Sequence, residues 1–392
     1  MKPLSLYIHI PFCVQKCDYC DFLSFSATDG EKAAYVNALI DELNAASVTL
    51  GAAAGEREVI SVYIGGGTPS AIPAEDIVRI LGAVREGFFM DPDCEISMEV
   101  NPGTVTVENL NVYRAAGINR LSVGCQSMHD NELKLLGRIH TKQDILNTFH
   151  AARRAGFTNI NIDLMSALPD QKYDDYMDSV AQVVALSPEH ISAYALMLEE
   201  GTPFYEEYSD EIRDEDLDLQ MYMETNRYLS AHGYERYEIS NYARLSDDAG
   251  ERTNNDAYRC LHNVVYWKRG DYLGCGLGAS SLIDEVRFHN TEDFDAYIAS
   301  AGNPDTLHED IEELDYHARM EEFMFLGLRM TEGISVKNFE ETFHHPIRRI
   351  YAKAIDSLKE EGLLAVEGDT IRLTDTGINV SNYALARFLF DE

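Results

Sequence analysis

The 392-residue chain is poor in basic residues: 32 Lys and Arg stand against 67 Asp and Glu, a formal net charge of −35. Proteins that bind DNA or RNA neutralise phosphates with lysine and arginine, so this balance argues against a nucleic-acid partner. No stretch approaches the eighteen or so apolar residues that a membrane span needs. The first thirty residues lack the charged and apolar segments of a secretory signal. We therefore expect no transmembrane segment and a cytoplasmic location.

Cysteine is scarce and unevenly placed. Three of the seven cysteines fall within eight residues, as Cys13-Val-Gln-Lys-Cys17-Asp-Tyr-Cys20, and the other four are scattered. A secreted protein held together by disulfides would need a smaller chain and an even number of cysteines. In a reducing compartment, clustered thiols are typical of a metal site. We therefore predict that Cys13, Cys17 and Cys20 are metal ligands.

Short runs of β-branched residues alternate with helical patterns over residues 4–198. This repeated order predicts a parallel sheet with helices outside it. Six units favour a partial barrel, so we predict an α/β fold built on a partial (β/α)6 barrel of the TIM type. The predicted strands are Leu4–Ile10, Val59–Ile64, Glu95–Val100, Arg120–Val123, Asn159–Met165 and His190–Leu198, and the helices include Glu31–Thr49, Ala74–Phe88 and Ile145–Ala155.

The pattern changes after residue 200. Helices are predicted over Asp214–His232, Glu312–Met330 and Ile347–Glu361, and Gly362–Leu373 then has the pattern of a small hairpin. Two helices followed by a hairpin, or wing, is the order of a winged-helix domain, which often binds DNA. Because basic residues are few, we interpret this region as a protein-contact or packing module instead. We predict a barrel core at residues 1–200, an extension at 201–300 and a smaller, mostly α, winged-helix-like domain at 301–392.

Polar or glycine-rich residues follow almost every predicted strand. Gly65-Gly66-Gly67 follows the second strand, Glu99 ends the third, and Asp163 lies on the fifth. Ligands of parallel α/β folds gather at the carboxyl ends of the strands, so we expect these residues on one rim. Taken alone, a triple glycine more often marks a tight turn than a ligand contact, and a single charge more often forms a surface ion pair.

The C-x3-C-x2-C spacing fits an iron–sulfur cluster. Three thiolates can ligate three irons of a [4Fe–4S] cube and leave the fourth iron open to a small chelating molecule. A structural zinc site is the alternative, and it usually needs four ligands and a second C-x2-C pair. The sequence has no such second pair, but His9 could supply a fourth ligand. The residues therefore favour the cluster and leave zinc open.

The cysteine loop and its surroundings resemble the radical SAM superfamily and, within it, the oxygen-independent coproporphyrinogen oxidase-like family. The matching stretches are Tyr7-Ile8-His9-Ile10-Pro11-Phe12-Cys13, Gly65-Gly66-Gly67-Thr68-Pro69-Ser70, Glu99 with Asn101-Pro102-Gly103, Gly137-Arg138-Ile139-His140, and Asp163-Leu164-Met165 followed by Leu168-Pro169. The resemblance implies S-adenosylmethionine (SAM) on the open iron. It also implies that SAM sites are lined by Tyr7, Tyr19, Gly66, Gly67, Thr68, Glu99, Gln126, Arg138, Asp163 and Ala195.

Two departures point to one branch of that family. Coproporphyrinogen-oxidising enzymes carry a further cysteine two positions after the third, where this chain has Phe22. They also carry an arm before the first strand, whereas the first predicted strand of this chain starts by Leu4. The stretch His262-Asn-Val-Val-Tyr266-Trp267 is instead similar to the signature of HemW-type heme chaperones in the same family. The resemblance implies that His262 ligates heme iron and that Tyr266 and Trp267 offer flat faces to the porphyrin.

Two points around this stretch stay open on the residues alone. A histidine beside aromatic residues is more often a hydrogen-bonded core residue than a ligand. The segment Gly270–Gly278, which follows, either covers a cofactor with its backbone or forms the turn that enters a strand.

These features predict a heme chaperone on a radical SAM scaffold, which binds a [4Fe–4S] cluster, SAM and heme. We expect it to receive heme from a donor and to transfer it to hemoproteins, including membrane-bound respiratory enzymes. The alternative is an anaerobic radical SAM oxidoreductase that acts on a porphyrinogen or on heme, as a coproporphyrinogen III dehydrogenase does. The missing fourth cysteine and the His262 stretch favour the chaperone.

Overall fold

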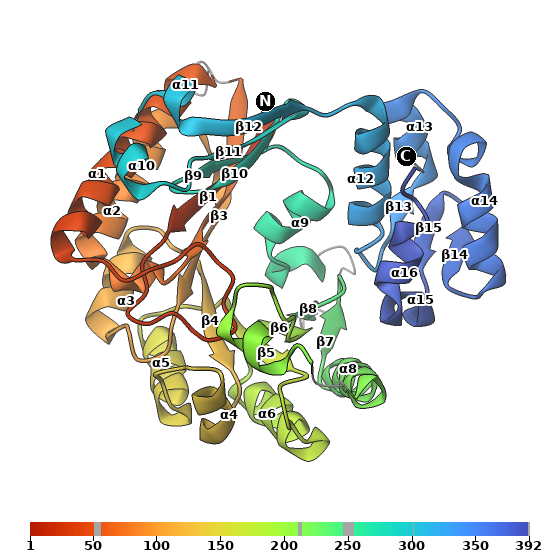
Figure 1. Cartoon of the computed structure of the whole chain (residues 1–392), viewed down its shortest axis with the longest axis horizontal. Helices are drawn as coiled ribbons and strands as arrows, with labels where there is room; N and C mark the ends of the chain where they lie inside the picture. Colours follow the sequence, from red (N-terminus) through yellow and green to blue (C-terminus); the bar gives the residue numbers. More distant parts are fainter. Residues whose placement is uncertain (51–55, 211–213, 246–254, 301, 391–392) are drawn as a thin grey trace.

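A twelve-stranded sheet forms the centre of the molecule in the computed structural model, which describes residues 1–50, 56–210, 214–245, 255–300 and 302–390 (Figure 1). Six parallel strands lie side by side in chain order, and the sheet ends in the edge strands β12 (His308–Glu313) and β7 (Tyr234–Arg236). The sheet does not close into a complete barrel, and its six parallel strands have helices outside them, so the predicted α/β fold with a partial barrel is confirmed. The six strands are β1 (Lys2–Ile10), β2 (Arg57–Gly66), β3 (Met90–Val100), β4 (Arg120–Gln126), β5 (Ile160–Ser166) and β6 (His190–Ala195).

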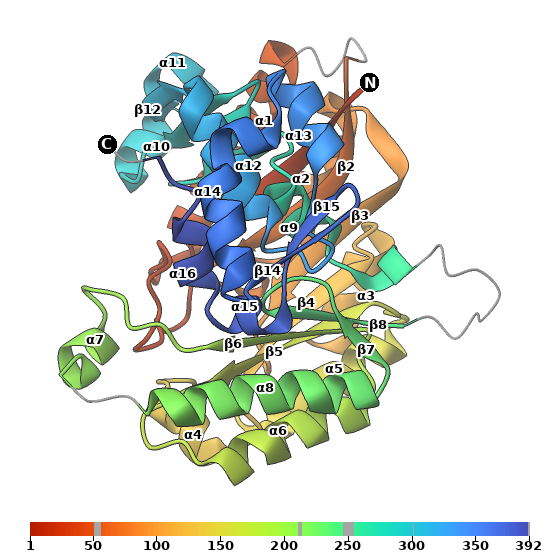
Figure 2. The same ribbon diagram turned by 90° about the vertical axis from the view of Figure 1, so that its right-hand side faces the viewer.

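Helices that connect these strands cover the outer face of the sheet. In Figure 2 the long helix α8 (Glu215–Ala231) runs beside α6 (Tyr173–Leu186). None of the described helices is long and apolar enough to cross a membrane. The connecting helices are α1 (Asp29–Thr49), α2 (Ala74–Gly87), α3 (Val107–Ala115), α4 (Asp130–Leu135), α5 (Lys142–Arg154) and α6 (Tyr173–Leu186); α7 (Pro203–Tyr208) precedes α8.

The strands carry apolar side chains on one face and polar ones on the other. In β1, Leu6 and Ile8 are fully buried against the helices, whereas Ser5, Tyr7 and His9 alternate with them. Successive side chains of a strand point to opposite faces, so the polar set must lie on the inner face of the sheet. The interior of the partial barrel is therefore polar.

Further strands extend the sheet beyond both ends of the parallel set. The segment Gly270–Gly278 contains β9 (Tyr272–Cys275), which pairs in parallel with β1, so this segment builds the sheet itself. On the opposite side, β8 (Asn241–Arg244) pairs antiparallel with β6. The remaining strands of the first side are β10 (Ser280–Ile283) and β11 (Val286–Asn290), followed by α10 (Phe294–Ser300) and α11 (Pro304–Leu307).

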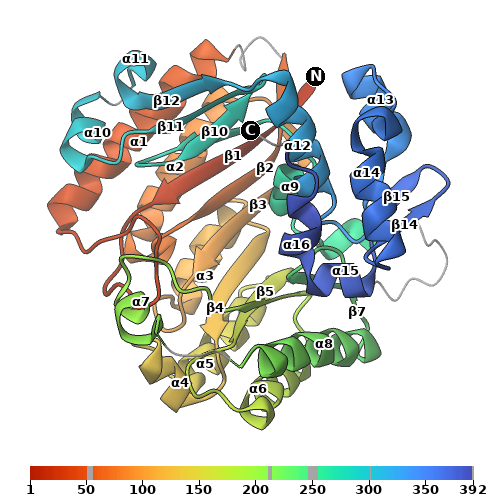
Figure 3. The same cartoon turned by 45° about the vertical axis from the view of Figure 1, so that its right-hand side comes forward.

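The C-terminal part forms a mostly helical unit with a small sheet, as predicted for a winged-helix-like end. Its own apolar core contains Phe339, Tyr351 and Phe388. Figure 3 shows these helices beside the curved layer of parallel strands. The domain limits near residues 200 and 300 stay a prediction. The elements are α12 (Tyr316–Gly327), β13 (Ile334–Ser335), α13 (Val336–Phe343), α14 (Ile347–Glu360), β14 (Leu364–Glu367), β15 (Thr370–Leu373), α15 (Asp375–Asn379) and α16 (Ser381–Ala386).

Two predicted helix starts lie three or more residues from the observed ones, because capping residues set the start of each helix. The helix predicted from Ile145 begins three residues earlier, since the Thr141 side chain accepts from the Asp144 amide and the Asp144 carboxylate accepts from the Thr141 amide. The helix predicted from Glu312 begins after Asp315, which accepts from two amides of the first turn. Glu312 itself belongs to β12 and pairs with β11.

Helix α1 carries a buried carboxylate that should make the stability of the fold depend on pH. Glu42 accepts hydrogen bonds from the Tyr297 hydroxyl (2.5 Å), the Asn290 amide (2.7 Å) and the Gly276 amide (2.9 Å). Burial nevertheless raises the pKa of Glu42 to about 7. The folded state then holds its proton more tightly than the unfolded state between pH 4.5 and 7, so the free energy of unfolding falls as pH rises through that window.

We expect Glu42→Gln to remove this dependence. At 1.36 kcal/mol per pKa unit, the wild-type chain should lose on the order of 3 kcal/mol more than the variant between pH 5 and pH 8. Urea unfolding of both proteins at the two pH values measures the difference, and other titrating groups cancel in it. Parallel pH profiles of the two proteins would contradict the assignment.

Candidate cofactor site

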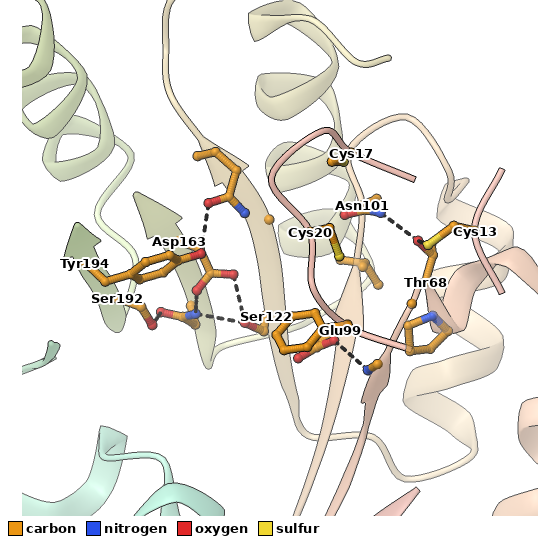
Figure 4. Close-up of a pocket in the computed structure, with 18 of the residues that line it drawn as sticks. Cys13, Cys17, Cys20, Thr68, Glu99, Asn101, Ser122, Asp163, Ser192 and Tyr194 are labelled. Atoms are coloured by element: carbon orange, nitrogen blue, oxygen red, sulfur yellow. Dashed lines mark hydrogen bonds between the residues drawn. The ribbon is translucent and has the colours of Figure 1, made fainter. Parts of the chain in front are cut away.

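The inner face of the sheet surrounds a cavity of about 340 Å³ (Figure 4). The three cysteines lie on one side of it, and Ser192 and Tyr194 of β6 lie on the other. The strand ends therefore bring Cys13 and Tyr194, which are 181 positions apart in the sequence, to one place, as expected for a parallel α/β fold.

The cysteine loop leaves the carboxyl end of β1 and is tied down at its base and near its middle. The Cys13 amide donates to the carbonyl of Phe25 (2.9 Å), and the Phe25 amide donates to the carbonyl of Pro11 (2.8 Å). Near the middle of the loop, the Asp18 amide donates to the carbonyl of Leu136 (3.3 Å). All three loop thiols are free, half-buried and turned to the same cavity, which suits a set of soft ligands for iron.

The alternative of a four-ligand zinc site loses support. Among the described residues, no three His, Cys, Asp or Glu side chains form a site for a single metal ion. The ring nitrogens of His9 are both engaged, Nδ1 with the Tyr7 hydroxyl (3.0 Å) and Nε2 with the carbonyl of Leu23 (2.9 Å). His9 could therefore serve as a fourth ligand only if one of these two hydrogen bonds broke.

The glycine-rich loop after β2 packs directly on the cysteine loop. The Gly67 amide donates to the carbonyl of Ile10 (2.9 Å), and the Thr68 amide donates to the carbonyl of Phe12 (2.8 Å). A Cβ atom on Gly67 would lie 2.8 Å from the Phe12 oxygen and 3.1 Å from the sulfur of Cys13. Close backbone approach, rather than a tight turn alone, therefore requires glycine here.

A chain of hydrogen bonds connects Arg138 with the cysteine loop. The guanidinium donates to the Asn101 carbonyl oxygen (3.0 Å) and to the Tyr19 hydroxyl (2.8 Å). The Asn101 amide donates to the Thr68 hydroxyl (2.7 Å), which lies 3.5 Å from the sulfur of Cys13. The buried Nε of Arg138 has no partner within the described ranges, so the group keeps a donor for an anionic ligand.

Two buried carboxylates face the same cavity. Glu99 accepts from the Tyr63 hydroxyl (2.9 Å) and the Gly66 amide (3.1 Å), and Asp163 accepts from the Asn161 amide (2.7 Å). Burial raises the pKa of Glu99 to about 7 and also raises that of Asp163. Both carboxylates therefore suit a ligand that brings positive charge or hydroxyl donors.

Most of the residues predicted for SAM sites lie around this cavity. Tyr7 and Ala195 do not line it: the Tyr7 hydroxyl bonds to His9, and Ala195 is exposed at the end of β6. The residues that do are Tyr19, Gly66, Gly67, Thr68, Glu99, Gln126, Arg138 and Asp163, and Asn101 of the matched motif lies beside them. The cavity is also lined by residues that the sequence did not single out: Tyr63, Arg120, Ser122, Asn161, Ser192, Tyr194, Ser240 and Asn241.

The H-N-x-x-Y-W stretch forms α9 (Leu261–Trp267), which lies against the inner side of the sheet (Figure 1). His262 is 1% exposed; its Nδ1 shares a hydrogen bond with the Ser61 hydroxyl (3.0 Å) and its Nε2 with the Tyr266 hydroxyl (2.9 Å). Burial, together with the positive charge of Arg120, lowers the pKa of His262 to about 3. The ring is therefore neutral, and both of its nitrogens are engaged.

Trp267 points to a different part of the molecule. The Arg329 guanidinium lies 4.3 Å from its ring centre, and the indole borders a second cavity next to Phe323 and Gly333. Asn263, on the same helix, lines the first cavity. The structure thus does not bring His262 and Trp267 to one common space.

Two family models match the chain. The Radical SAM superfamily model matches residues 7–183, and the HemN C-terminal domain model matches residues 314–380. Among solved structures, the chain is similar to the coproporphyrinogen III oxidase HemN from Escherichia coli, described as a radical SAM enzyme. The TM-score is 0.81 at 25% identity, over 99% of this chain and 90% of that one.

Curated relatives extend the match over the whole length. The heme chaperone HemW of Lactococcus lactis subsp. lactis (strain IL1403) is 32% identical, over 100% of this chain and 98% of that protein. HemW of Bacillus subtilis (strain 168) is 32% identical, over 98% and 99%, and HemW of Escherichia coli (strain K12) is 40% identical, over 72% and 71%. The chain therefore belongs to the radical SAM superfamily and, within it, to the HemW family.

Proposed function

We propose that this protein is a heme chaperone: it holds a [4Fe–4S] cluster and SAM, binds heme, and transfers heme from a donor to hemoproteins in the cytoplasm or at the membrane. The observation that supports this most is full-length similarity to HemW proteins, combined with a cavity in which three free thiols face two carboxylates and an arginine. Phe22 borders that cavity where coproporphyrinogen-oxidising enzymes have a fourth cysteine.

The residues around the cavity fit the two cofactors. Cys13, Cys17 and Cys20 would hold three irons, and Arg138 would hold the carboxylate of SAM. Glu99 and Asp163 would take its ammonium group and ribose hydroxyls. When bound, the cluster supplies one electron at a time, and this chain contributes orientation and exclusion of water.

Heme ligation by His262 needs a change in the structure. Either ring nitrogen becomes available to iron only when its hydrogen bond to Ser61 or to Tyr266 breaks. The bond to Tyr266 lies within α9 and is the simpler one to release, because Tyr266 is partly exposed whereas Ser61 is fully buried. We propose Nε2 of His262 as the heme ligand, with Tyr266 beside the porphyrin. Trp267 borders a separate cavity, so it would reach the porphyrin only if α9 also moves.

Titration of the anaerobically reconstituted protein with hemin tests this proposal. We expect a saturable Soret band whose position shifts and whose affinity falls at least about tenfold in His262→Ala, because an axial ligand is lost. Tyr266→Phe should bind hemin at least as tightly as wild type, since the competing hydrogen bond is absent. His344 and His345 are exposed and can capture hemin nonspecifically, so the double variant His344→Ala, His345→Ala is the control. Identical spectra and affinities for His262→Ala and wild type would contradict the ligand assignment.

Similarity to HemN over nearly the whole chain supports a second candidate, an oxidoreductase that acts on a porphyrinogen or on heme. Incubation with dithionite, SAM and coproporphyrinogen III, or with hemin, tests it. Release of 5′-deoxyadenosine with CO₂ or with an altered tetrapyrrole would favour this candidate. An unchanged tetrapyrrole in the presence of a fully loaded cluster would favour the chaperone.

A further inference from the structure

Arg120 is a buried cation that the cavity leaves without a partner. It lies at the start of β4 and is 2% exposed, yet it borders the cavity. Within the described part of the chain, its guanidinium forms neither a hydrogen bond nor an ion pair within 4 Å, and its Nε is buried and unsatisfied. Burying a charge without a direct partner is costly, and the fields of Glu95, Glu99 and Asp163 offset that cost only from a distance, so the guanidinium remains open to a direct anionic partner.

The carboxylates nearby are already committed to other partners. Glu95, whose field acts on Arg120, accepts from the Leu261 amide (3.0 Å) and the His262 amide (3.4 Å), and so caps α9. Asp163 and Glu99 have their own donors, as described above. No carboxylate of the described chain therefore neutralises Arg120 directly.

Another polar side chain of the cavity wall is also incompletely satisfied. Asn241 of β8 lies opposite Ser192 of β6 and borders the cavity, and its side-chain oxygen is buried without a partner in the described ranges. Ser240 and Asn263 border the same space. This part of the wall thus offers a cation, which can pair with an acidic group of a ligand, and an amide oxygen, which can accept from a proton donor of the same ligand.

This place is distinct from the one assigned to SAM. Arg120 and Gln126 lie at opposite ends of β4, six residues or roughly 20 Å of strand apart. Arg138 and the cysteine loop lie at the Gln126 end, where they are linked by hydrogen bonds. A molecule whose carboxylate is held by Arg138 does not need Arg120 for the same group.

We propose that Arg120 binds a carboxylate of the second ligand of the cavity, at the end opposite the cysteine loop. A carboxylate fits better than a phosphate, because Glu99 and Asp163 border the cavity and would repel a dianion more strongly than a monoanion. Resting on the proposed heme function, the group is a propionate side chain of the porphyrin. His262, which feels the charge of Arg120, lies close to the same end.

Hemin and hemin dimethyl ester, in which both propionates are esterified, test the proposal on the reconstituted protein. Wild type should bind hemin more tightly than the ester. Arg120→Met should lose about 10- to 100-fold in affinity for hemin and nothing for the ester, because only the free carboxylate pairs with the guanidinium. Arg120→Lys keeps the charge and should recover part of the loss. Equal losses for both ligands, or no loss, would overturn the proposal.

Three further readouts separate the alternatives. Arg120→Met should keep the SAM affinity of wild type, and a selective loss of SAM binding would reassign Arg120 to SAM. Its melting temperature should equal or exceed that of wild type, because methionine removes an unpaired buried charge; a lower value would mean that Arg120 is a structural group. If wild type binds neither hemin nor its ester, both the proposed heme function and this inference are wrong. If wild type and Arg120→Met bind hemin equally tightly, only the inference about Arg120 is wrong.

Discussion

Cys17→Ser is expected to leave the protein almost without iron and sulfide after anaerobic reconstitution. The cluster needs three soft thiolates from one loop, and a serine hydroxyl is a poor ligand for its iron. Cys17 is half-buried at the cavity wall, in a loop that backbone hydrogen bonds hold on both sides, so the fold should survive the change. Iron and sulfide assays, with the charge-transfer absorbance of the cluster, measure the loss.

Cys94→Ser is the matched control for this experiment. Cys94 is a buried cysteine of β3, and it does not border the cavity. It should retain full iron and sulfide. A full cluster in Cys17→Ser, or the same loss in both variants, would exclude the cysteine loop as the cluster site and with it the scheme for SAM.

Arg138→Met should abolish SAM binding while the cluster remains. Removing one partner of a buried, charge-assisted pair costs about 2–5 kcal/mol, which corresponds to a loss of affinity of roughly 30- to several thousand-fold. The methionine keeps most of the buried volume. The measurement is the change that SAM causes in the EPR spectrum of the reduced cluster, titrated in both proteins.

The iron content of Arg138→Met must be measured in the same experiment. Arg138 donates a hydrogen bond to Tyr19, next to Cys20, so the substitution could also disturb the cluster. Arg114→Met, on the outer helix α3, is the control and should bind SAM as wild type does. If SAM changed the spectrum of Arg138→Met at the wild-type concentration, its carboxylate would have to be held elsewhere in the cavity.

The strands and the rim of the site were predictable because their signals are local. Runs of β-branched residues marked all six parallel strands, and the residues at their ends were found from motif and position. Asn161, Ser122 and Ser192 were missed, although a period of two along β4, β5 and β6 places them on the same face as Gln126, Asp163 and Tyr194. That period was a usable signal in the sequence.

The surroundings of His262 were not predictable from the sequence. Its partner Ser61 is 201 positions away, and the two meet only because α9 folds back across the inner side of the sheet. The same holds for Arg120, which the sequence presents as one charge at the start of a strand. Only the three-dimensional arrangement shows that its neighbours have other partners.

The position of β1 has a consequence for synthesis of the chain. One edge of β1 pairs with β2, and the other pairs with β9, which begins only at Tyr272. At 5–20 residues per second, a ribosome needs roughly 13 to 50 s to reach β9 after β1 has emerged. During this time the strand that leads into the cysteines has one edge without its partner, so a nascent chain is exposed there to wrong pairing. Strand β1 is thus synthesised long before β9, the strand that completes its pairing in the sheet.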